Sequence, residues 1–412
     1  MGVLNKDADE RKFAGLKLIC ENPSNPCLTP EDGWDSLPTL TQVWTAVASA
    51  LQMHAWPSGG GVRIVPVMLD SLTKQLTDGG SLSAEQVRDA IGGLTDEAVT
   101  PEAKADFLTA LANKGETPEE IAAFASELRD KALPVPLDDE TRGREMLDVC
   151  GTGGDKLGTF NISTTVAIVA AAAGVTVAKH GNRAITSKSG SADVLAALGI
   201  PTELTPEQVA AGLRDHGFAF IFAPGYHPAF KHIMPARKLC AERGQRTVFN
   251  FLGPLLNPAR PTAQLIGVPK GELCEPIGRV LQSIGIRRGM VVNGRVGDGA
   301  MDELSTLGEN TIAEFYQDRG FTVSRDEPEL FPLQPATLDD LKGGDAEANA
   351  ATIRAILAGE DRGPRRDAVL LNAAHALFVA AKTDSALEGW ELAASVIDDG
   401  QAKRKLEELT QS

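Results

Sequence analysis

Hydrophobic and polar residues follow two different patterns along this chain, with the change near residue 145. Between residues 68 and 134 apolar side chains recur at helical spacing, as at Ile121, Phe124 and Leu128. After residue 145 short apolar runs alternate with helical stretches, which is typical of a largely parallel sheet covered on both faces. We expect buried strands at 146–150, 175–179, 218–223 and 290–292, and helices at 163–173, 191–198 and 206–216.

Polar residues mark the starts of the expected helices. Ser83 and Gln86 have the spacing of a capping box, in which each side chain bonds a free backbone amide of the first turn. Thr117 stands before a Pro, a pairing that favours an N-cap followed by the first helical residue. These patterns predict a small helical domain at 65–140, joined by a second helical segment near 226–245, and a large α/β domain at 141–412.

Residues 1–64 show neither pattern. Residues 20–40 are rich in Pro, Asn and Asp, and a Ser-Gly-Gly-Gly run at 58–61 is typical of a flexible joint. We interpret this part as an N-terminal extension of unknown role, with a mis-set start as the alternative.

The amino-acid composition and net charge restrict the kinds of partner that we expect this chain to bind. With 412 residues and 42% hydrophobic residues, the chain can bury a sizeable core. Its net charge of −16 argues against a nucleic-acid partner, because binding to phosphate backbones needs clusters of Lys and Arg. A small anion is still possible, since backbone amides and a few local cations can hold one.

The cysteines and the apolar runs indicate the cellular compartment in which we expect the protein. The five cysteines are scattered without metal-ligand spacing, which favours a reduced intracellular protein. The most apolar run, 166–178, is too short to cross a membrane, and the first residues carry charges where a signal peptide needs apolar ones. We therefore expect a cytoplasmic protein with no membrane contact.

A glycine-rich loop follows the first expected strand, in the sequence CGTGGDKLGTFNIST from residue 150 to 164. Glycines let the backbone approach an anion closely, and amides and hydroxyls at a helix start bind its oxygens. A tight turn is the simpler interpretation of Gly-Thr-Gly-Gly alone. Because Asp155 and three amide or hydroxyl side chains follow the same strand, we favour an anion site, which matches neither a Walker A loop nor a dinucleotide fingerprint.

Two further polar segments follow the next expected strand. The sequence KHGNR at 179–183 places two cations, an imidazole and an amide at a strand end, and a hydroxyl-rich run at 186–193 leads into a helix. Ligands of open α/β sheets bind at the carboxyl ends of the strands. A basic turn would explain one such loop, but three in succession predict a ligand with several negative groups.

These motifs, together with SKSGSADVLAALG, HPAFKHIMPARKL, RTVFNFLGPLLNPA, DELST and DAVLLNAAHALFVAAK in this order, closely resemble the anthranilate phosphoribosyltransferase family. The resemblance runs from about residue 68 to near the C-terminus. It implies the second step of tryptophan biosynthesis, a helical domain hinged to an α/β domain of the nucleoside phosphorylase/phosphoribosyltransferase kind, Mg²⁺ as cofactor, and a homodimer. Association with anthranilate synthase subunits stays open.

The resemblance also implies roles for individual residues. Those for phosphoribosyl pyrophosphate are Gly151, Gly153, Gly154, Asp155, Thr159, Asn161, Ser163, Thr164, Lys179 and Ser191. Those for anthranilate are Gly151, His180, Asn182 and Arg237, those for the metal are Ser163, Asp302 and Glu303, and those expected to be catalytic are Lys179 and Arg237. One departure is Asn293, where the family often has His, and the loop at 295–301 is slightly long.

The implied reaction is attack of the anthranilate amine on C1 of the ribose with departure of pyrophosphate. The aromatic amine is neutral at pH 7, so we expect orientation and charge stabilisation to dominate over base catalysis. A pyrimidine nucleoside phosphorylase and a non-catalytic nucleic-acid-binding paralogue are the competing interpretations. The acidic charge and the Asp302-Glu303 pair argue against the second.

Overall fold

The computed structural model of the chain describes residues 65–184, 188–317 and 319–411. The predicted extension at 1–64 and the hydroxyl-bearing residues 186 and 187 lie outside the described residues. Residues Arg63–Ser412 form one compact unit, and every element below belongs to it.

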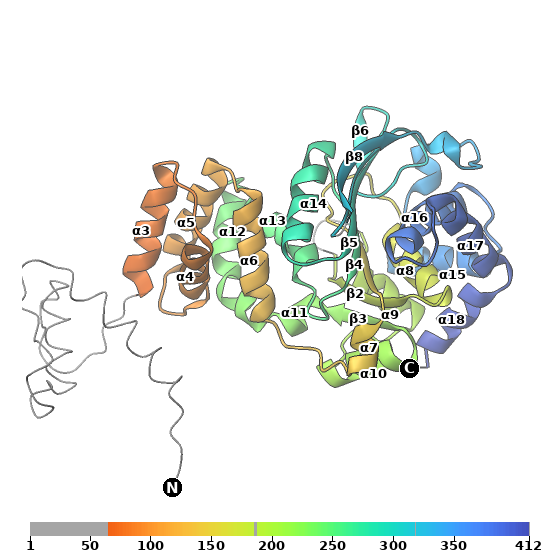
Figure 1. Cartoon of the computed structure of the whole chain (residues 1–412), viewed down its shortest axis with the longest axis horizontal. Helices are drawn as coiled ribbons and strands as arrows, with labels where there is room; N and C mark the ends of the chain where they lie inside the picture. Colours follow the sequence, from red (N-terminus) through yellow and green to blue (C-terminus); the bar gives the residue numbers. More distant parts are fainter. Residues whose placement is uncertain (1–64, 185–187, 318, 412) are drawn as a thin grey trace, which may run out of the picture. The chain divides into compact units, whose positions relative to one another are not determined.

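Five helices form a bundle (Figure 1), namely α3 (Val65–Thr77), α4 (Ala84–Thr95), α5 (Pro101–Lys114), α6 (Pro118–Asp130) and α12 (Met234–Glu242). The predicted capping box of α4 is present at Ser83, and the predicted N-cap of α6, Thr117, forms a capping box with Glu120 that the sequence analysis did not predict. Helix α12 comes from a distant part of the sequence and packs on α5, where Lys104 Nζ donates to the carbonyl oxygen of His232 at 3.0 Å. Phe107 and Phe124 are fully buried in the bundle core.

The larger part of the unit is built on one mixed sheet. Its strands are β1 (Met146–Gly151), β2 (Thr176–Gly181), β3 (Phe218–Phe222), β4 (Ala263–Gly267), β5 (Arg288–Val296), β6 (Gly299–Met301), β7 (Asn310–Tyr316) and β8 (Gly320–Asp326). The strand order is β3-β2-β1-β4-β5-β7-β8, and β6 pairs with β5. The first five strands are mutually parallel, while β6, β7 and β8 join antiparallel.

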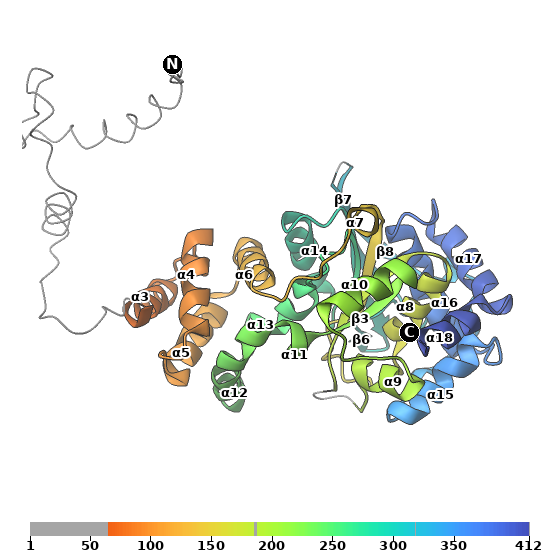
Figure 2. The same ribbon diagram turned by 90° about the horizontal axis from the view of Figure 1, so that it is seen from below.

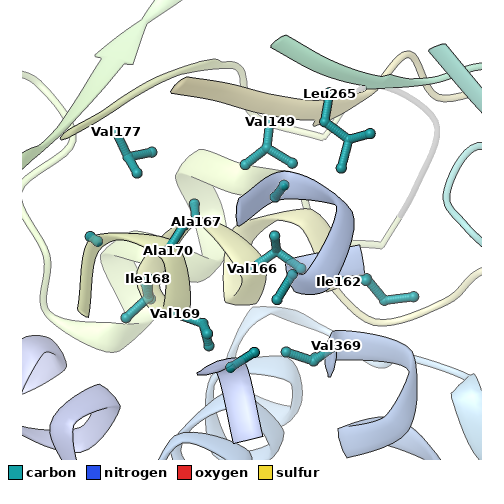
Figure 3. Packing of buried hydrophobic residues seen from close by; sticks show 14 of the residues in the cluster. Val149, Ile162, Val166, Ala167, Ile168, Val169, Ala170, Val177, Leu265 and Val369 are labelled. Atoms are coloured by element: carbon teal, nitrogen blue, oxygen red, sulfur yellow. The ribbon is translucent and has the colours of Figure 1, made fainter. Parts of the chain in front are cut away.

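Helices cover both faces of the sheet, with α14 (Cys274–Ser283) on one side and α8 (Ile162–Ala172) and α16 (Pro364–Val379) on the other (Figures 1 and 2). Val166 of α8 packs between Val149 and Leu265 of the sheet and Val369 of α16 (Figure 3). The other helices are α7 (Asp139–Gly143), α9 (Ser191–Leu198), α10 (Pro206–Asp215), α11 (Ala223–Tyr226), α13 (Phe249–Leu252), α15 (Ala346–Leu357), α17 (Ala386–Asp398) and α18 (Gln401–Leu409).

The predicted fold class, a helical domain with an α/β domain on a mainly parallel sheet, is confirmed. Strand β5 runs well beyond the predicted 290–292, and β4, β6, β7 and β8 were not predicted. Most of β8 is exposed, so its residues lack the apolar pattern on which the prediction relied. Within the described part of the chain, no helix is both long enough and apolar enough to cross a membrane.

Candidate functional site

The candidate site lies at the carboxyl ends of β1, β2 and β4, where three segments meet. They are the glycine loop after β1, the KHGNR segment at the end of β2, and the acidic residues that follow β6. This edge of a parallel sheet is where open α/β proteins bind ligands.

Glycine ends two neighbouring strands for a steric reason. Gly151 of β1 and Gly267 of β4 are partners in the sheet, and Asp302 lies directly against both. A Cβ added at Gly151 would come within 2.8 Å of Asp302 Cγ, and one added at Gly267 would overlap the Asp302 backbone. The two glycines therefore allow the acidic segment to reach the edge of the sheet.

The glycine loop curls around the same carboxylate. Gly153 and Gly154 have φ angles of 77° and 92°, in the left-handed region that other residues rarely adopt. The Gly153 amide donates a hydrogen bond to Asp302 Oδ2 at 2.6 Å. Asp155 follows the turn, and its carboxylate accepts from the Leu157 amide at 3.2 Å.

Helix α8 presents its first turn to the acidic residues. The Ser163 amide donates to Glu303 Oε1 at 3.3 Å, and Thr164 is buried behind it. Asn161, at the N-cap, donates to the Ser189 carbonyl at 3.3 Å and accepts from Asn349 at 2.9 Å. Thr159, just upstream, pairs with Lys342 in an isolated bridge. A helix start with free amides favours bound anions.

Asp155, Asp302 and Glu303 form a cluster of carboxyl groups. Burial, followed by the charge of Asp155, raises the pKa of Asp302 to about 7. Burial, followed by the charge of Asp302, raises the pKa of Glu303 to about 8. Buried carboxylates that repel one another in this way suit a hard divalent cation, which Mg²⁺ is.

These carboxylates do not make a complete metal cage. Among the described residues, no group of three or more His, Cys, Asp or Glu side chains is arranged to hold a metal ion. Mg²⁺ commonly takes one or two protein carboxylates and completes its shell with water and phosphate oxygens. Asp302 and Glu303 fit that partial role.

Asn293 fixes the position of the acid pair. Its amide donates to the carbonyl oxygens of Val268 at 2.7 Å and Met301 at 3.2 Å, so it ties the residue before Asp302 to the end of β4. The segment 295–301 is a hairpin between β5 and β6, and the acid pair lies in the bend that follows it. The departure from the family at residue 293 thus serves a structural purpose here.

Lys179 is almost completely buried at the end of β2. Its Nζ donates to the Val149 carbonyl of β1 at 2.7 Å. Burial lowers the pKa of Lys179, while the negative charges of neighbouring groups, among them Asp148 and Glu303, oppose that shift. The cation therefore lies beneath the carboxylate cluster, where it balances part of its charge.

Asp148 and Asn257 belong to the site although the sequence analysis missed them. The Asp148 carboxylate is fully buried and accepts from the His180 amide at 3.2 Å and from Asn257 Nδ2 at 2.9 Å. Asn257 also donates to the Ala178 carbonyl at 2.7 Å. The pair joins β1 to the end of β2. Its signal in the sequence was a carboxylate inside an otherwise apolar strand.

His180 begins a chain of rings that leads to Arg237. Ring centroids of His180 and His227 are 5.3 Å apart, and those of His227 and Phe230 are 5.5 Å apart. Phe230 and Phe249 are also 5.5 Å apart, and the Arg237 guanidinium lies 5.3 Å from the Phe249 ring centroid. This chain, termed the aromatic ladder, connects the end of β2 to α12.

The rings of the aromatic ladder are uncharged at neutral pH. Burial lowers the pKa of His180 to about 3, and the positive charge of a protonated His227 acts in the same direction. Burial alone lowers the pKa of His227 to about 4. Both Nε2 atoms are buried without a protein hydrogen-bond partner among the described residues. Arg237 contacts Met234 Sδ at 3.7 Å and Phe249.

Asn182 and Ser191 lie beside the same edge. The Asn182 carbonyl accepts from Ser191 Oγ at 3.3 Å and from the Ala192 amide at 3.2 Å, which joins the KHGNR segment to the start of α9. Gly190 has no room for a Cβ because the backbone of 182–184 lies against it. Arg183 forms ion pairs with Asp193 and Glu203, so its charge already has partners within the protein.

The structure thus brings the predicted residues together in two groups. The first surrounds the acid pair and contains Gly151, Gly153, Asp155, Ser163, Asp302 and Glu303, with Lys179 beneath. The second follows the aromatic ladder and contains His180 and Arg237, with His227 as a member that the sequence analysis did not select.

Comparison with known proteins identifies the class. Residues 143–403 match the a/b domain model of the glycosyl transferase family, and residues 70–132 match the helical bundle domain model of the same family. The chain therefore contains both domains of this glycosyl transferase class.

Similarity to individual proteins indicates the family within this glycosyl transferase class. An anthranilate phosphoribosyltransferase of Geobacter sp. (strain M21) is 44% identical over 352 residues, which cover 83% of this chain and 98% of the relative. A crystal structure of the Thermus thermophilus enzyme is 43% identical, with a TM-score of 0.75 over 82% of this chain and 98% of that one. The Saccharomyces cerevisiae enzyme in complex with PRPP and Mg is 30% identical, with a TM-score of 0.74 over 84% and 97%. The chain belongs to the anthranilate phosphoribosyltransferase family.

Proposed function

We propose that the chain transfers the phosphoribosyl group of 5-phosphoribosyl-1-pyrophosphate to the amine of anthranilate, giving N-(5-phosphoribosyl)anthranilate and pyrophosphate. The observation that carries the proposal is the Asp302-Glu303 pair, held against the glycine loop at the carboxyl edge of the sheet. The activity is that of a pentosyltransferase in tryptophan biosynthesis.

The glycine loop and the start of α8 bind the sugar pyrophosphate in this proposal. Gly153 and Gly154 are exposed and leave room for the ligand, and Asn161, Ser163 and Thr164 supply polar groups at a helix N-terminus. Such amides and hydroxyls bind phosphate oxygens well. Asp155 and Thr159 flank the loop, and Ser191 lies across from it at the start of α9.

Mg²⁺ is the proposed cofactor, and Asp302 and Glu303 are its protein ligands, with Ser163 beside them. The ion supplies charge neutralisation for the pyrophosphate as it leaves. The positive charge of Lys179 acts on Glu303 and offsets part of the cost of burying that carboxylate.

Anthranilate is proposed to bind along the aromatic ladder. Its ring stacks among apolar and aromatic side chains, and its carboxylate pairs with the Arg237 guanidinium, which forms no ion pair within the described part of the chain. His180 and Asn182 lie at the opposite end of the ladder, near the sugar pyrophosphate. The arrangement directs the amine toward C1 of the ribose.

Catalysis in this scheme depends on orientation and charge. The anthranilate nitrogen forms a bond to C1 while the bond from C1 to the pyrophosphate oxygen breaks, through a transition state with oxocarbenium character. The neutral amine needs no strong base for its attack, and it loses a proton to water after the bond has formed. Side chains of the ladder exclude water from the reacting carbon.

The decisive experiment follows anthranilate fluorescence in a mixture of the protein, phosphoribosyl pyrophosphate and MgCl₂. Loss of fluorescence that requires all three components supports the proposal. Turnover of a pyrimidine nucleoside with inorganic phosphate, without anthranilate consumption, would replace it by a phosphorylase.

The proposal also covers the oligomeric state and the cellular compartment of the protein. We infer a homodimer from the family resemblance, which light scattering of the purified protein would measure directly. A cytoplasmic location stays a prediction from the scattered cysteines.

A further inference from the structure

A cavity separate from the candidate site lies between the end of β8 and helix α16. It encloses about 290 Å³ and is termed the β8–α16 cavity. Its walls are largely apolar, with Ile312, Phe331 and Leu371 among them. None of the residues proposed above to bind substrate or metal lines it.

Two large apolar side chains stand exposed at this cavity. Leu330 is 74% exposed and Leu387 is 52% exposed, and both belong to its lining. Exposed leucines cost free energy unless an apolar group covers them, at about 25 cal/mol per Å² of apolar surface. They indicate a ligand with an apolar body.

One histidine in the lining keeps a ring nitrogen available to a ligand. His375 is only 6% exposed, and its Nδ1 bonds the Leu371 carbonyl at 2.9 Å in the same helix. A carbonyl accepts only, so Nδ1 carries the proton and Nε2 is an acceptor. Within the described residues Nε2 forms no hydrogen bond, and burial keeps the imidazole neutral by lowering its pKa. The ring therefore offers an acceptor to a donor in the cavity.

Two carboxylates stand at the same cavity without a cation. Asp326 and Glu327 belong to the lining, and neither forms an ion pair within residues 65–184, 188–317 and 319–411. The charge of Asp326 acts on His375, which places the carboxylate near the ring. The neighbouring Arg325 pairs with Glu309 instead, at 3.8 Å. The cavity thus combines apolar walls with hydrogen-bond acceptors and negative charge.

We propose that the β8–α16 cavity is a second ligand site, which takes a small molecule with an apolar body and a protonated amine. The apolar body covers Leu330, Leu387 and Phe331, and the ammonium donates to Asp326 and to His375 Nε2. An anion of the same shape is rejected, because it would meet two carboxylates and an acceptor nitrogen. The site is independent of the proposed transfer reaction.

Calorimetric titration of the full-length protein with 2-phenylethylamine at pH 7 tests the proposal. We expect saturable binding at one site, and at least tenfold weaker affinity in Asp326→Asn and in His375→Leu. Glu347→Gln removes an exposed carboxylate elsewhere and serves as the matched control, with affinity unchanged. The Asp326 variant changes a partly exposed side chain at a strand end, so its folding is not at risk.

Two further titrations separate this site from the aromatic ladder, which could also attract an aromatic amine. Binding of 2-phenylethylamine should persist in Arg237→Ala and in the presence of saturating anthranilate. Equal affinity for 3-phenylpropionate, which has the same body and a negative charge, would overturn the proposal. So would the absence of binding, or binding lost with Arg237→Ala and retained in Asp326→Asn.

Discussion

At the candidate site, the neighbouring atoms explain why a particular residue type occurs at a given position. Gly151 has no side chain because Asp302 occupies the space, and Asn293 bonds two carbonyls that set the course of the acidic segment. Asp148 is a buried acid because it holds the end of β2 to β1 through two hydrogen bonds.

Arg237→Ala should raise the KM for anthranilate at least tenfold and leave the KM for phosphoribosyl pyrophosphate within twofold. The reason is that the guanidinium lies on the aromatic ladder and is free to pair with a carboxylate. Initial rates with each substrate varied in turn measure the effect. Lys238→Ala, next to it and exposed, is the control. Equal weakening of both substrates would make Arg237 a structural residue.

Gly151→Ala should lower kcat/KM at least tenfold and raise the magnesium concentration needed for half-maximal rate. The added methyl collides with the Asp302 carboxyl group, so the acid pair must move. Gly92→Ala in α4 is the control, because a Cβ there meets nothing within 4 Å. That change should leave the kinetics intact and stabilise the helix by about 0.5–1 kcal/mol. A normal magnesium titration in Gly151→Ala would contradict the prediction.

The Asp148→Asn variant should change how stability depends on pH. Burial raises the pKa of Asp148 to about 6 from an ordinary value of 3.8, despite hydrogen bonds that oppose the shift. Between pH 4 and 6 the unfolded chain therefore releases this proton while the folded chain keeps it. The free energy of unfolding of the wild type then falls with rising pH, by on the order of 3 kcal/mol from this group.

Asparagine has no proton to release, so the variant lacks that component. The wild type's advantage over the variant should be largest near pH 4 and should shrink until about pH 6. Urea unfolding of both proteins at pH 4.5, 5.5 and 7 measures the difference. Parallel pH curves would show that Asp148 is ionised in the folded state throughout.

Helix α6 shows how one side chain can anchor an element. Its capping-box residue Glu120 accepts from the amides of Thr117 at 2.9 Å and Leu82 at 2.8 Å, and from Lys114 Nζ at 2.7 Å. The carboxylate is almost fully buried, as is the side chain of Lys114. The start of α6 is thereby tied to the end of α5 and to the turn before α4.

Glu120→Gln should reduce the free energy of unfolding by about 3 kcal/mol. The amide cannot accept all three bonds, and the charge of Lys114 loses its partner in a buried setting. Glu119→Gln changes the exposed neighbour by the same atoms and should cost less than about 0.5 kcal/mol. Chemical denaturation of the three proteins gives the comparison. A loss below 1 kcal/mol at Glu120 would mean that water reaches the pair.

At the scale of the whole molecule, the reaction is assigned to residues 63–412. This unit contains the described helices and strands, and the two matching family models cover residues 70–132 and 143–403. Both residue groups of the candidate site lie within it.

Removal of residues 1–62 should therefore leave kcat and both KM values unchanged within twofold. The thermal midpoint of unfolding should change by less than about 2 °C. Steady-state kinetics and calorimetry of the shortened chain measure this, with the full-length protein as reference. A large loss of either property would give the N-terminal segment a role in catalysis or folding.

Elements with strong local signals could be predicted from the amino-acid sequence. The capping box at Ser83, the N-cap at Thr117 and the apolar runs of β1, β2 and β3 were predicted because caps and buried strands depend on near neighbours in the chain. The glycine loop and KHGNR gave the candidate ligand site for the same reason. The family resemblance then supplied roles that no local pattern contains.

Contacts between residues far apart in the sequence could not be predicted in this way. The contact of Asp302 with Gly151 and Gly267 joins three segments far apart in the sequence, and the Asp148–Asn257 bond spans 109 positions. The exposed strand β8 and the aromatic ladder have no periodic signal, because their neighbours come from other elements. The pattern of apolar and polar residues indicates only the local backbone conformation and which residues are buried. Contacts between distant residues depend on how the elements pack together.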